Sequence, residues 1–152
     1  MITKKGDFRF NKNLKEFNKL KVSIPIAIGN MAKNHFLQAF RRGAQNGGGF
    51  TNSSRNGWPK RKRETRISRN KGILISSGHL RRSIGVLSKS WRAIVLGTKG
   101  ILYAEVHNKG GSIRTRNGKQ FKMPKREYLG DSSVLNKKIV SFIYKKLRIT
   151  VR

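Results

Sequence analysis

Cysteine is absent from this chain of 152 residues, which excludes a disulfide framework and thiolate metal sites. Long apolar runs are absent as well. No stretch approaches the ~18 consecutive apolar residues of a membrane-spanning helix, and the N-terminus lacks the apolar segment of a signal peptide. We therefore expect a soluble protein that is not secreted and has no membrane partner.

Acidic residues are few. Six Asp and Glu stand against 36 Lys and Arg, which gives a formal net charge of +30. A compact domain of this charge repels itself unless salt or a polyanion screens it, so the composition predicts a strongly negative partner, most simply nucleic acid. Metal-assisted phosphodiester cleavage needs several converging carboxylates or imidazoles, and here the acids are scattered singly. A small nuclease is therefore the least favoured function.

The remaining candidates for catalysis are weak. His35 is expected to be partly buried on a helix, His79 follows a turn, and His107 lies two residues from Glu105, a spacing that does not place both side chains together on a helix. Residues 76–78 (SSG) lack a paired acid and base and are predicted to form a turn. Because GxGxxG and P-loop patterns are also missing, we predict a protein that is not an enzyme and has no catalytic residue, metal or cofactor.

Helical periodicity is clear in the N-terminal third. Residues 1–12 are polar and basic and are predicted to form a flexible arm. Residues 14–20 fit a short amphipathic helix. A second helix is predicted from Pro25, which suits a first helical turn, to about Arg42, with Gly43 as its stop.

The segment over residues 43–72 lacks periodicity and is rich in glycine, hydroxyl and basic residues. We predict a long loop, anchored only by Trp58 and Pro59. It is either a solvated mobile loop or an arm that contacts phosphates without reading bases, because recognition motifs are missing. The predicted contact residues are Arg55, Lys60, Arg61, Lys62, Arg63, Arg66, Arg69 and Lys71.

The middle of the chain is predicted to form β structure. Two antiparallel strands are predicted over residues 82–88 and 92–98, and a short helical turn over residues 103–107. A second hairpin is predicted with strands 113–116 and 120–123 around Asn117 and Gly118, a strong hairpin signal. Four aromatic residues interleave with cations here and are predicted to pack in the core rather than to stack on bases, namely Trp91, Tyr103, Phe121 and Tyr128.

A last helix is predicted over residues 131–148. Asp131, Ser132 or Ser133 would cap it. Its apolar face comprises Leu135, Ile139, Phe142, Ile143 and Leu147. The order of elements predicts a single α+β domain, in which the N-terminal and C-terminal helices pack on a small antiparallel sheet over residues 73–130, with a long basic loop.

Several sequence blocks occur in an order that resembles one family. They are Trp58 with Pro59, residues 73–84 (ILISSGHLRRSI), residues 93–97 (AIVLG), residues 103–110 (YAEVHNKG) and residues 123–130 (MPKREYLG). This order is similar to that of the virion morphogenesis, or tail completion, proteins of tailed bacteriophages, and of the neck and head–tail joining proteins that share their fold. Family members usually have Pro-Ala-Arg-Pro where this chain has Pro124-Lys125-Arg126-Glu127.

The resemblance implies structural rather than catalytic roles for the motif residues. Gly78 would permit a tight turn, Leu80 and Ile84 would anchor that turn in the core, and Arg126 would pair with Glu105 or Asp131. Tyr103 and Ala104 would pack beneath the long helix, and Tyr128 and Leu129 would pack against the sheet. The motif residues with implied roles are Trp58, Gly78, Leu80, Ser83, Tyr103, Ala104, Gly110, Pro124, Arg126, Leu129 and Gly130.

The resemblance also implies a place of action. Such a subunit would be assembled in the host cytoplasm and would lie in the virion, at the neck or the head-proximal tail. Its partners would be the portal, head-closure and tail proteins, further copies of itself in a ring, and the genomic DNA through non-specific contacts. The composition alone equally suits a ribosomal or nucleoid-associated nucleic-acid-binding protein, which is the alternative.

Overall fold

The structure is a computed structural model that describes residues 10–46, 50, 57–66, 69 and 71–150. The elements in chain order are α1 (Phe10–Asn46), α2 (His79–Ser83), β1 (Ile84–Lys89), β2 (Ile94–Thr98), α3 (Ala104–Lys109), β3 (Gly111–Arg114), β4 (Gln120–Met123) and α4 (Ser133–Thr150). The predicted α+β class is confirmed. The strands form two separate antiparallel hairpins, β1–β2 and β3–β4.

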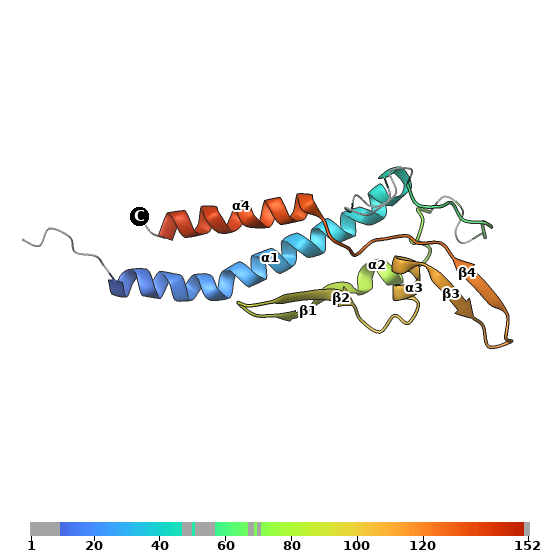
Figure 1. The fold of residues 1–152 in the computed structure, drawn as a ribbon, viewed down its shortest axis with the longest axis horizontal. Helices are drawn as coiled ribbons and strands as arrows, with labels where there is room; N and C mark the ends of the chain where they lie inside the picture. The colour runs from blue at the N-terminus through green and yellow to red at the C-terminus, as the bar shows by residue number, and fades with distance from the viewer. Residues whose placement is uncertain (1–9, 47–49, 51–56, 67–68, 70, 151–152) are drawn as a thin grey trace, which may run out of the picture.

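Helix α1 is the central element of an elongated molecule. Helix α4 runs beside it on one side, and the β1–β2 hairpin lies on its other side (Figure 1). The β3–β4 hairpin lies near the C-terminal part of α1, together with α2 and α3. No helix among the described residues is long and apolar enough to cross a membrane.

Helix α1 is continuous where the sequence predicted two helices. Pro25 lies inside it and is buried. An interior proline costs about 3 kcal/mol relative to alanine because it removes a hydrogen bond and crowds the preceding turn. Packing of the turns before the proline offsets that cost: Phe17 contacts Trp91 edge-to-face with ring centroids 5.9 Å apart. Both ends of this region also differ from the prediction. Residues 10–12, predicted to lie in a flexible arm, belong to α1, and the helix continues past Gly43, its predicted stop.

The core lies where α1 meets α2, α3, the start of α4 and the segment that follows α1. Phe50, for which the sequence predicted no role, is 5 % exposed and stacks on Phe36 at 6.0 Å, so Trp58 and Pro59 are not the loop's only anchor. His35 is buried beside both rings, as predicted. The core residues are Ala32, Phe36, Ala39, Phe40, Phe50, Trp58, Leu80, Ile84, Ala104, Tyr128 and Leu135.

Local signals place most boundaries within about two residues. Strand β2 begins at Ile94 rather than at residue 92, and β3 spans Gly111–Arg114 rather than residues 113–116. Strand β1 begins at Ile84, two residues after the predicted start, because residues 82 and 83 complete α2. At this end of α2 the Ser83 hydroxyl donates to the Leu80 carbonyl at 2.8 Å. Of the three predicted caps for α4, Ser132 is the one used: its buried hydroxyl accepts a hydrogen bond from the Leu135 N–H at 3.3 Å.

Candidate polyanion-binding site

Arg126 and Trp58 hold the start of the basic segment against the last motif block. Nε and Nη2 of Arg126 donate to the Pro59 carbonyl at 3.0 and 2.9 Å, and Nη2 also donates to the Lys60 carbonyl at 3.2 Å. In the other direction, Nε1 of Trp58 donates to the Glu127 carbonyl at 3.1 Å. These reciprocal bonds tie two segments together that are far apart in the sequence.

The expected carboxylate partners of Arg126 are thus replaced by main-chain carbonyls. Glu105 pairs instead with Lys109 at 2.8 Å, and Asp131 accepts a hydrogen bond from Asn136. Arg126 is buried, and its burial, with the nearby charge of Arg61, lowers its pKa. A buried cation needs such acceptors because each unsatisfied donor in a dry site is costly.

Tyr128 links the last motif block to α3. Its hydroxyl donates to the Ala104 carbonyl at 2.7 Å, and its ring packs on Phe40 with centroids 5.3 Å apart. Tyr128 therefore packs against α1 and α3, whereas the resemblance implied packing against a sheet. Ala104 is buried as expected, whereas Tyr103 is 40 % exposed.

Asn108 is a motif-block residue for which the sequence predicted no role. Its Oδ1 accepts hydrogen bonds from the N–H groups of Tyr128 and Leu129 at 2.8 and 2.9 Å, and its Nδ2 donates to the Leu129 carbonyl at 2.7 Å. One side chain thus replaces the hydrogen bonds that a neighbouring strand would supply. The sequence could have indicated this role only through the amide side chain of residue 108 between two motif positions. An asparagine in such a place is too common in helices to predict a role.

Two motif glycines have backbone angles or neighbours that exclude a side chain. Gly78 precedes α2 with φ of 70°, and Gly110 follows α3 with φ of 78°. A Cβ on Gly110 would lie 3.0 Å from the main-chain nitrogen of Lys125. The tight turn implied at Gly78 is therefore confirmed, and Gly110 permits the close approach of two chain segments. The predicted anchors Leu80 and Ile84 are buried.

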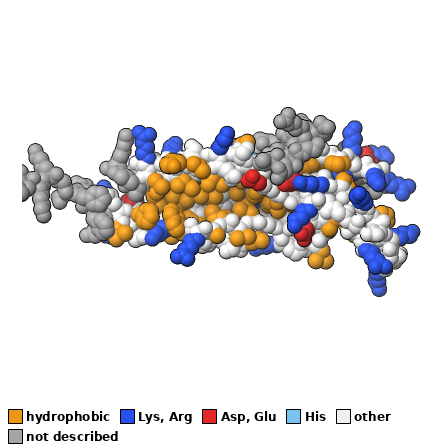
Figure 2. Space-filling view, viewed as in Figure 1, with side chains coloured by type: hydrophobic (Ala, Val, Ile, Leu, Met, Phe, Trp, Pro, Cys, Tyr) orange, Lys and Arg blue, Asp and Glu red, His pale blue; other side chains and the backbone are white. Residues whose placement is uncertain are grey.

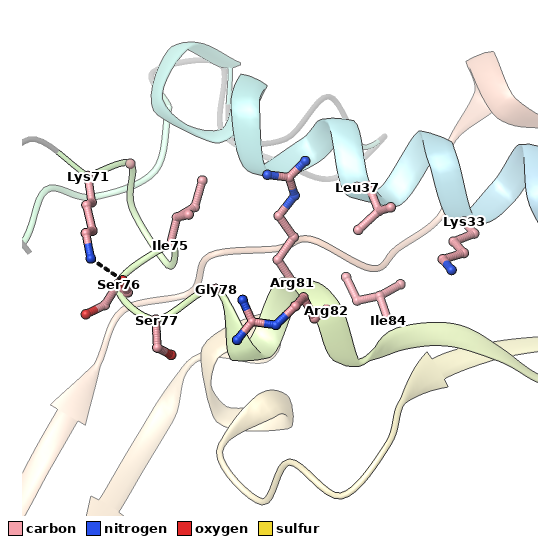
Figure 3. A pocket seen from close by; sticks show the side chains of 11 residues that line it. Lys33, Leu37, Lys71, Ile75, Ser76, Ser77, Gly78, Arg81, Arg82 and Ile84 are labelled. Atoms are coloured by element: carbon pink, nitrogen blue, oxygen red, sulfur yellow. Dashed lines mark hydrogen bonds between the residues drawn. The ribbon is translucent and has the colours of Figure 1, made fainter.

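A pocket of about 840 Å³ opens beside α1 and α2. Cations from three separate parts of the chain line it: Lys33 from α1, Lys71 from the basic segment, and Arg81 and Arg82 from α2 (Figure 3). None of the described residues that line it is acidic. The other lining residues are Leu37, Gly72, Ile75, Ser76, Ser77, Gly78 and Ile84.

Local geometry positions Arg82 and Lys71, two of these cations. The left-handed turn at Gly78 sets the direction of α2, and the Arg82 guanidinium lies above that turn, 2.9 Å from where a Cβ of residue 78 would be. Lys71 Nζ donates to the Ser76 carbonyl at 2.9 Å. Arg61 donates to the carbonyls of Lys71 and Gly72, so it fixes the wall of the pocket.

The predicted contact residues therefore divide into several groups. Lys60, Lys62, Arg63, Arg66, Arg69 and Lys71 are exposed. Arg61 is half-buried and holds the main chain, and Arg55 lies outside the described residues. The sequence did not indicate Lys33, Arg81 and Arg82, because they lie on helices where a cation is usually only solvated, and only the tertiary fold brings them to one pocket.

The arrangement can bind a polyanion. Several like charges around one concavity, with no carboxylate among the lining residues, raise the local positive potential, and the low-dielectric wall concentrates the field. Guanidinium groups and hydroxyls are suited to phosphate oxygens through charge-assisted hydrogen bonds. This chemistry is independent of base sequence.

Three of the four aromatic residues that were predicted to pack in the core are exposed instead. Tyr128 is buried, whereas Trp91 and Phe121 are 46 % and 53 % exposed. Trp91 contacts Phe17 in the N-terminal half of α1, and Tyr103 contacts His107 edge-to-face at 5.6 Å. Phe121 is the aromatic ring most open to solvent among these four.

His107 is half-buried near Arg126. Burial, and secondly the charge of Arg126, lower the pKa of its imidazole. Among the described residues, no three His, Cys, Asp or Glu side chains gather in a way that could hold a metal ion. His79, the first residue of α2, is exposed.

Comparison with known proteins identifies a family. No curated protein and no solved structure shows a significant match to the chain. A family model does match, over residues 15–148, which include every motif block described above. Its description is the phage virion morphogenesis family. The chain therefore belongs to the phage virion morphogenesis family and has a structural role in building the phage virion.

Proposed function

We propose that this protein is a neck or tail completion subunit that joins the head, at the portal, to the tail around the DNA channel. In this proposal several copies form a ring, and the cationic pocket faces the genomic DNA or an acidic protein ring. The observation that carries it is the convergence of Lys33, Lys71, Arg81 and Arg82 on one pocket without a carboxylate in its lining. Exposed cations of residues 60–71 would add further phosphate contacts.

An apolar surface on the helices supports self-association. Figure 2 shows a continuous hydrophobic area over the part of the molecule where α1 and α4 lie side by side. Monomeric proteins rarely expose large contiguous apolar areas, so such an area marks a contact surface. The large apolar side chains exposed on these two helices are Leu14, Val22, Ile26, Val134, Val140 and Tyr144.

The positive charge makes ring assembly depend on a polyanion that screens it. A net charge of +30 on each copy opposes association, while burial of the helix faces favours it. Screening by DNA or by an acidic neighbour would tip that balance. We therefore expect the ring to form on its polyanionic partner rather than in dilute, low-salt solution.

The proposal is tested by assembly and DNA binding in two sets of variants. With duplex DNA present, replacing Val140 and Tyr144 with Ser should prevent assembly in sedimentation while the DNA still binds. Replacing Lys33, Arg81 and Arg82 with Gln should still allow rings to form on duplex DNA in negative-stain images, because the exposed cations of residues 60–71 remain. This variant should flatten the log–log salt dependence of DNA binding by about 0.9 for each phosphate that the pocket no longer neutralises.

The matched control replaces three exposed lysines of α4, Lys137, Lys138 and Lys145, with Gln. This variant removes the same charge from a different face, so the salt dependence should change less. An equal effect of both triple variants would show a diffuse charge effect and contradict the pocket as the site. A wild-type protein that binds DNA as a monomer and never enters particles with portal and tail proteins would support the ribosomal or nucleoid-type alternative instead.

A further inference from the structure

Strand β4 has an unpaired edge. Within the described residues β3 and β4 form a two-stranded sheet. The Thr115 N–H donates to the Lys119 carbonyl at 2.8 Å, and hydrogen-bonded and non-hydrogen-bonded pairs alternate from that point along an antiparallel hairpin. Gln120 and Lys122 therefore occupy non-hydrogen-bonded positions. Their main-chain N–H and C=O groups point away from β3.

A groove of about 690 Å³ runs along this strand. Residues 120–124 contribute one part of its lining and residues 59–62 contribute another, with Arg126. The apolar lining residues are Pro59, Phe121, Met123 and Pro124, and more than half of the Phe121 side chain is exposed. The volume lies in the range typical of ligand sites in proteins.

The wall opposite β4 is held in place before any partner arrives. The Arg126 guanidinium holds the carbonyls of Pro59 and Lys60, so this part of the basic segment is fixed relative to the last motif block. A preformed groove loses less conformational entropy when it binds a partner than a mobile loop would.

The charge of the groove selects an acidic occupant. Lys60, Lys62 and Lys122 are exposed around it, and the lining has no acidic residue in the part of the chain that the structure describes. A second copy of this chain is a poor candidate, because it has only six acids, and Glu16, Glu105 and Glu127 already pair with lysines of their own chain.

We propose that the β4 edge and its groove bind an extended, acidic peptide segment of a different protein, which adds a third strand to the β3–β4 hairpin. Main-chain hydrogen bonds to Gln120 and Lys122 would supply affinity, as in other cases of strand addition. Apolar side chains at alternate positions of the peptide would contact Phe121 and Met123, and its carboxylates would meet the three lysines. Nucleic acid satisfies the charge but cannot pair with the strand edge.

The full-length protein is tested with a synthetic decapeptide in which Glu and Val alternate. Fluorescence anisotropy should show saturable binding. Amide hydrogen exchange at Gln120 and Lys122 should slow at least tenfold on binding, whereas amides of α4 should not change. The matched peptide has the same sequence with every main-chain nitrogen methylated, which keeps the charge and the side chains but removes every N–H donor, and it should bind at least tenfold more weakly.

Two substitutions at one position separate the strand edge from the charge. Lys122→Thr keeps the N–H and removes the charge, so binding should weaken only a few-fold. Lys122→Pro also removes the outward N–H, which β3 does not use, and should weaken binding at least tenfold beyond Lys122→Thr. The unbound wild-type exchange pattern of the hairpin serves as the standard for correct folding of both variants.

Two results would overturn the proposal. One is equal binding of the Glu–Val peptide and its N-methylated counterpart with no added protection at Gln120 and Lys122, which would mean charge attraction alone. The other is a single-stranded oligonucleotide that displaces the Glu–Val peptide without slowing exchange at the edge amides, which would assign the groove to nucleic acid. Because these measurements use wild-type protein, they remain decisive even if Lys122→Pro fails to fold.

Discussion

The guanidinium of Arg126 donates two hydrogen bonds to the carbonyl oxygen of Pro59, 67 residues earlier in the chain. The indole of Trp58, next to that proline, donates back to the carbonyl of Glu127, next to that arginine. This reciprocal contact connects the first and last motif blocks. It also fixes the basic segment beside both the cationic pocket and the β4 groove.

Removing the guanidinium should destabilise the fold. Arg126→Met leaves the carbonyls of Pro59 and Lys60 without their donor, and we expect the free energy of unfolding to fall by about 2 kcal/mol. The decrease is limited because the cost of burying a cation disappears as well. Urea denaturation followed by tryptophan fluorescence measures the change. The control, Arg116→Met in the exposed hairpin turn, should stay within about 0.5 kcal/mol of wild type, and equal effects would rule out a stabilising clamp.

The Tyr128 hydroxyl should contribute through one hydrogen bond. Tyr128→Phe keeps the ring in the core and removes the hydrogen bond to the Ala104 carbonyl, so the free energy of unfolding should fall by about 1–2 kcal/mol. Burial raises the pKa of Tyr128, so the phenol remains a donor over the ordinary pH range. The same change at Tyr144, which is 72 % exposed, should have almost no effect in the same denaturation assay. Equal stability of Tyr128→Phe and Tyr144→Phe would contradict this role of the Tyr128 hydroxyl.

Asn108 should be more sensitive than an exposed asparagine. Asn108→Ala removes three hydrogen bonds, and we expect a decrease of about 2–3 kcal/mol in the free energy of unfolding. Asn108→Asp keeps two acceptor bonds but cannot donate to Leu129, so its effect should be intermediate. Asn136→Ala on the surface of α4 is the reference and should change stability by less than about 0.5 kcal/mol. A reversed order of the two Asn108 variants would refute this account.

His107 should make stability depend on pH. Its pKa is lowered from the ordinary 6.5 by burial and by Arg126, so the unfolded chain takes up a proton at His107 more readily than the folded chain does. The stability is therefore complete above about pH 6.5 and declines as the pH falls through that value toward the lower folded pKa.

The measurement is the midpoint of thermal unfolding at pH values from about 7.5 to about 5, compared between variants. His107→Gln should show a shallower decline than wild type. His79→Gln is the reference for removing an exposed imidazole from the neighbouring helix. If His107→Gln declines as steeply as wild type, groups other than His107 cause the pH dependence.

Local patterns predicted the elements whose formation depends on near neighbours. The apolar stripe of α4 and its serine cap, and the Asn117–Gly118 turn, each depend on residues a few positions apart, and the structure has them close to the predicted places. Pro25 shows the limit of such reasoning. Its local preference predicts a helix start, but packing of Phe17 on Trp91 keeps the preceding turns helical.

The candidate site could be predicted only in part. The basic segment is visible in the composition, but Lys33, Arg81 and Arg82 are ordinary helix-surface cations until α1 and α2 meet. The burial of Phe50 and the three hydrogen bonds of Asn108 likewise depend on partners that no local pattern specifies. Contacts across long sequence separations carry no periodicity, so they have no local signal.

The sequence by itself determined the charge, the scarcity of carboxylates, the α+β order and the motif blocks, because composition and short-range spacing are properties of the chain. The tertiary structure decided which cations converge on one pocket, that Arg126 holds carbonyls rather than a carboxylate, and that β4 presents an unpaired edge beside a cationic groove. These features arise where distant segments pack, and packing free energy summed over many contacts outweighs the preference of any single residue.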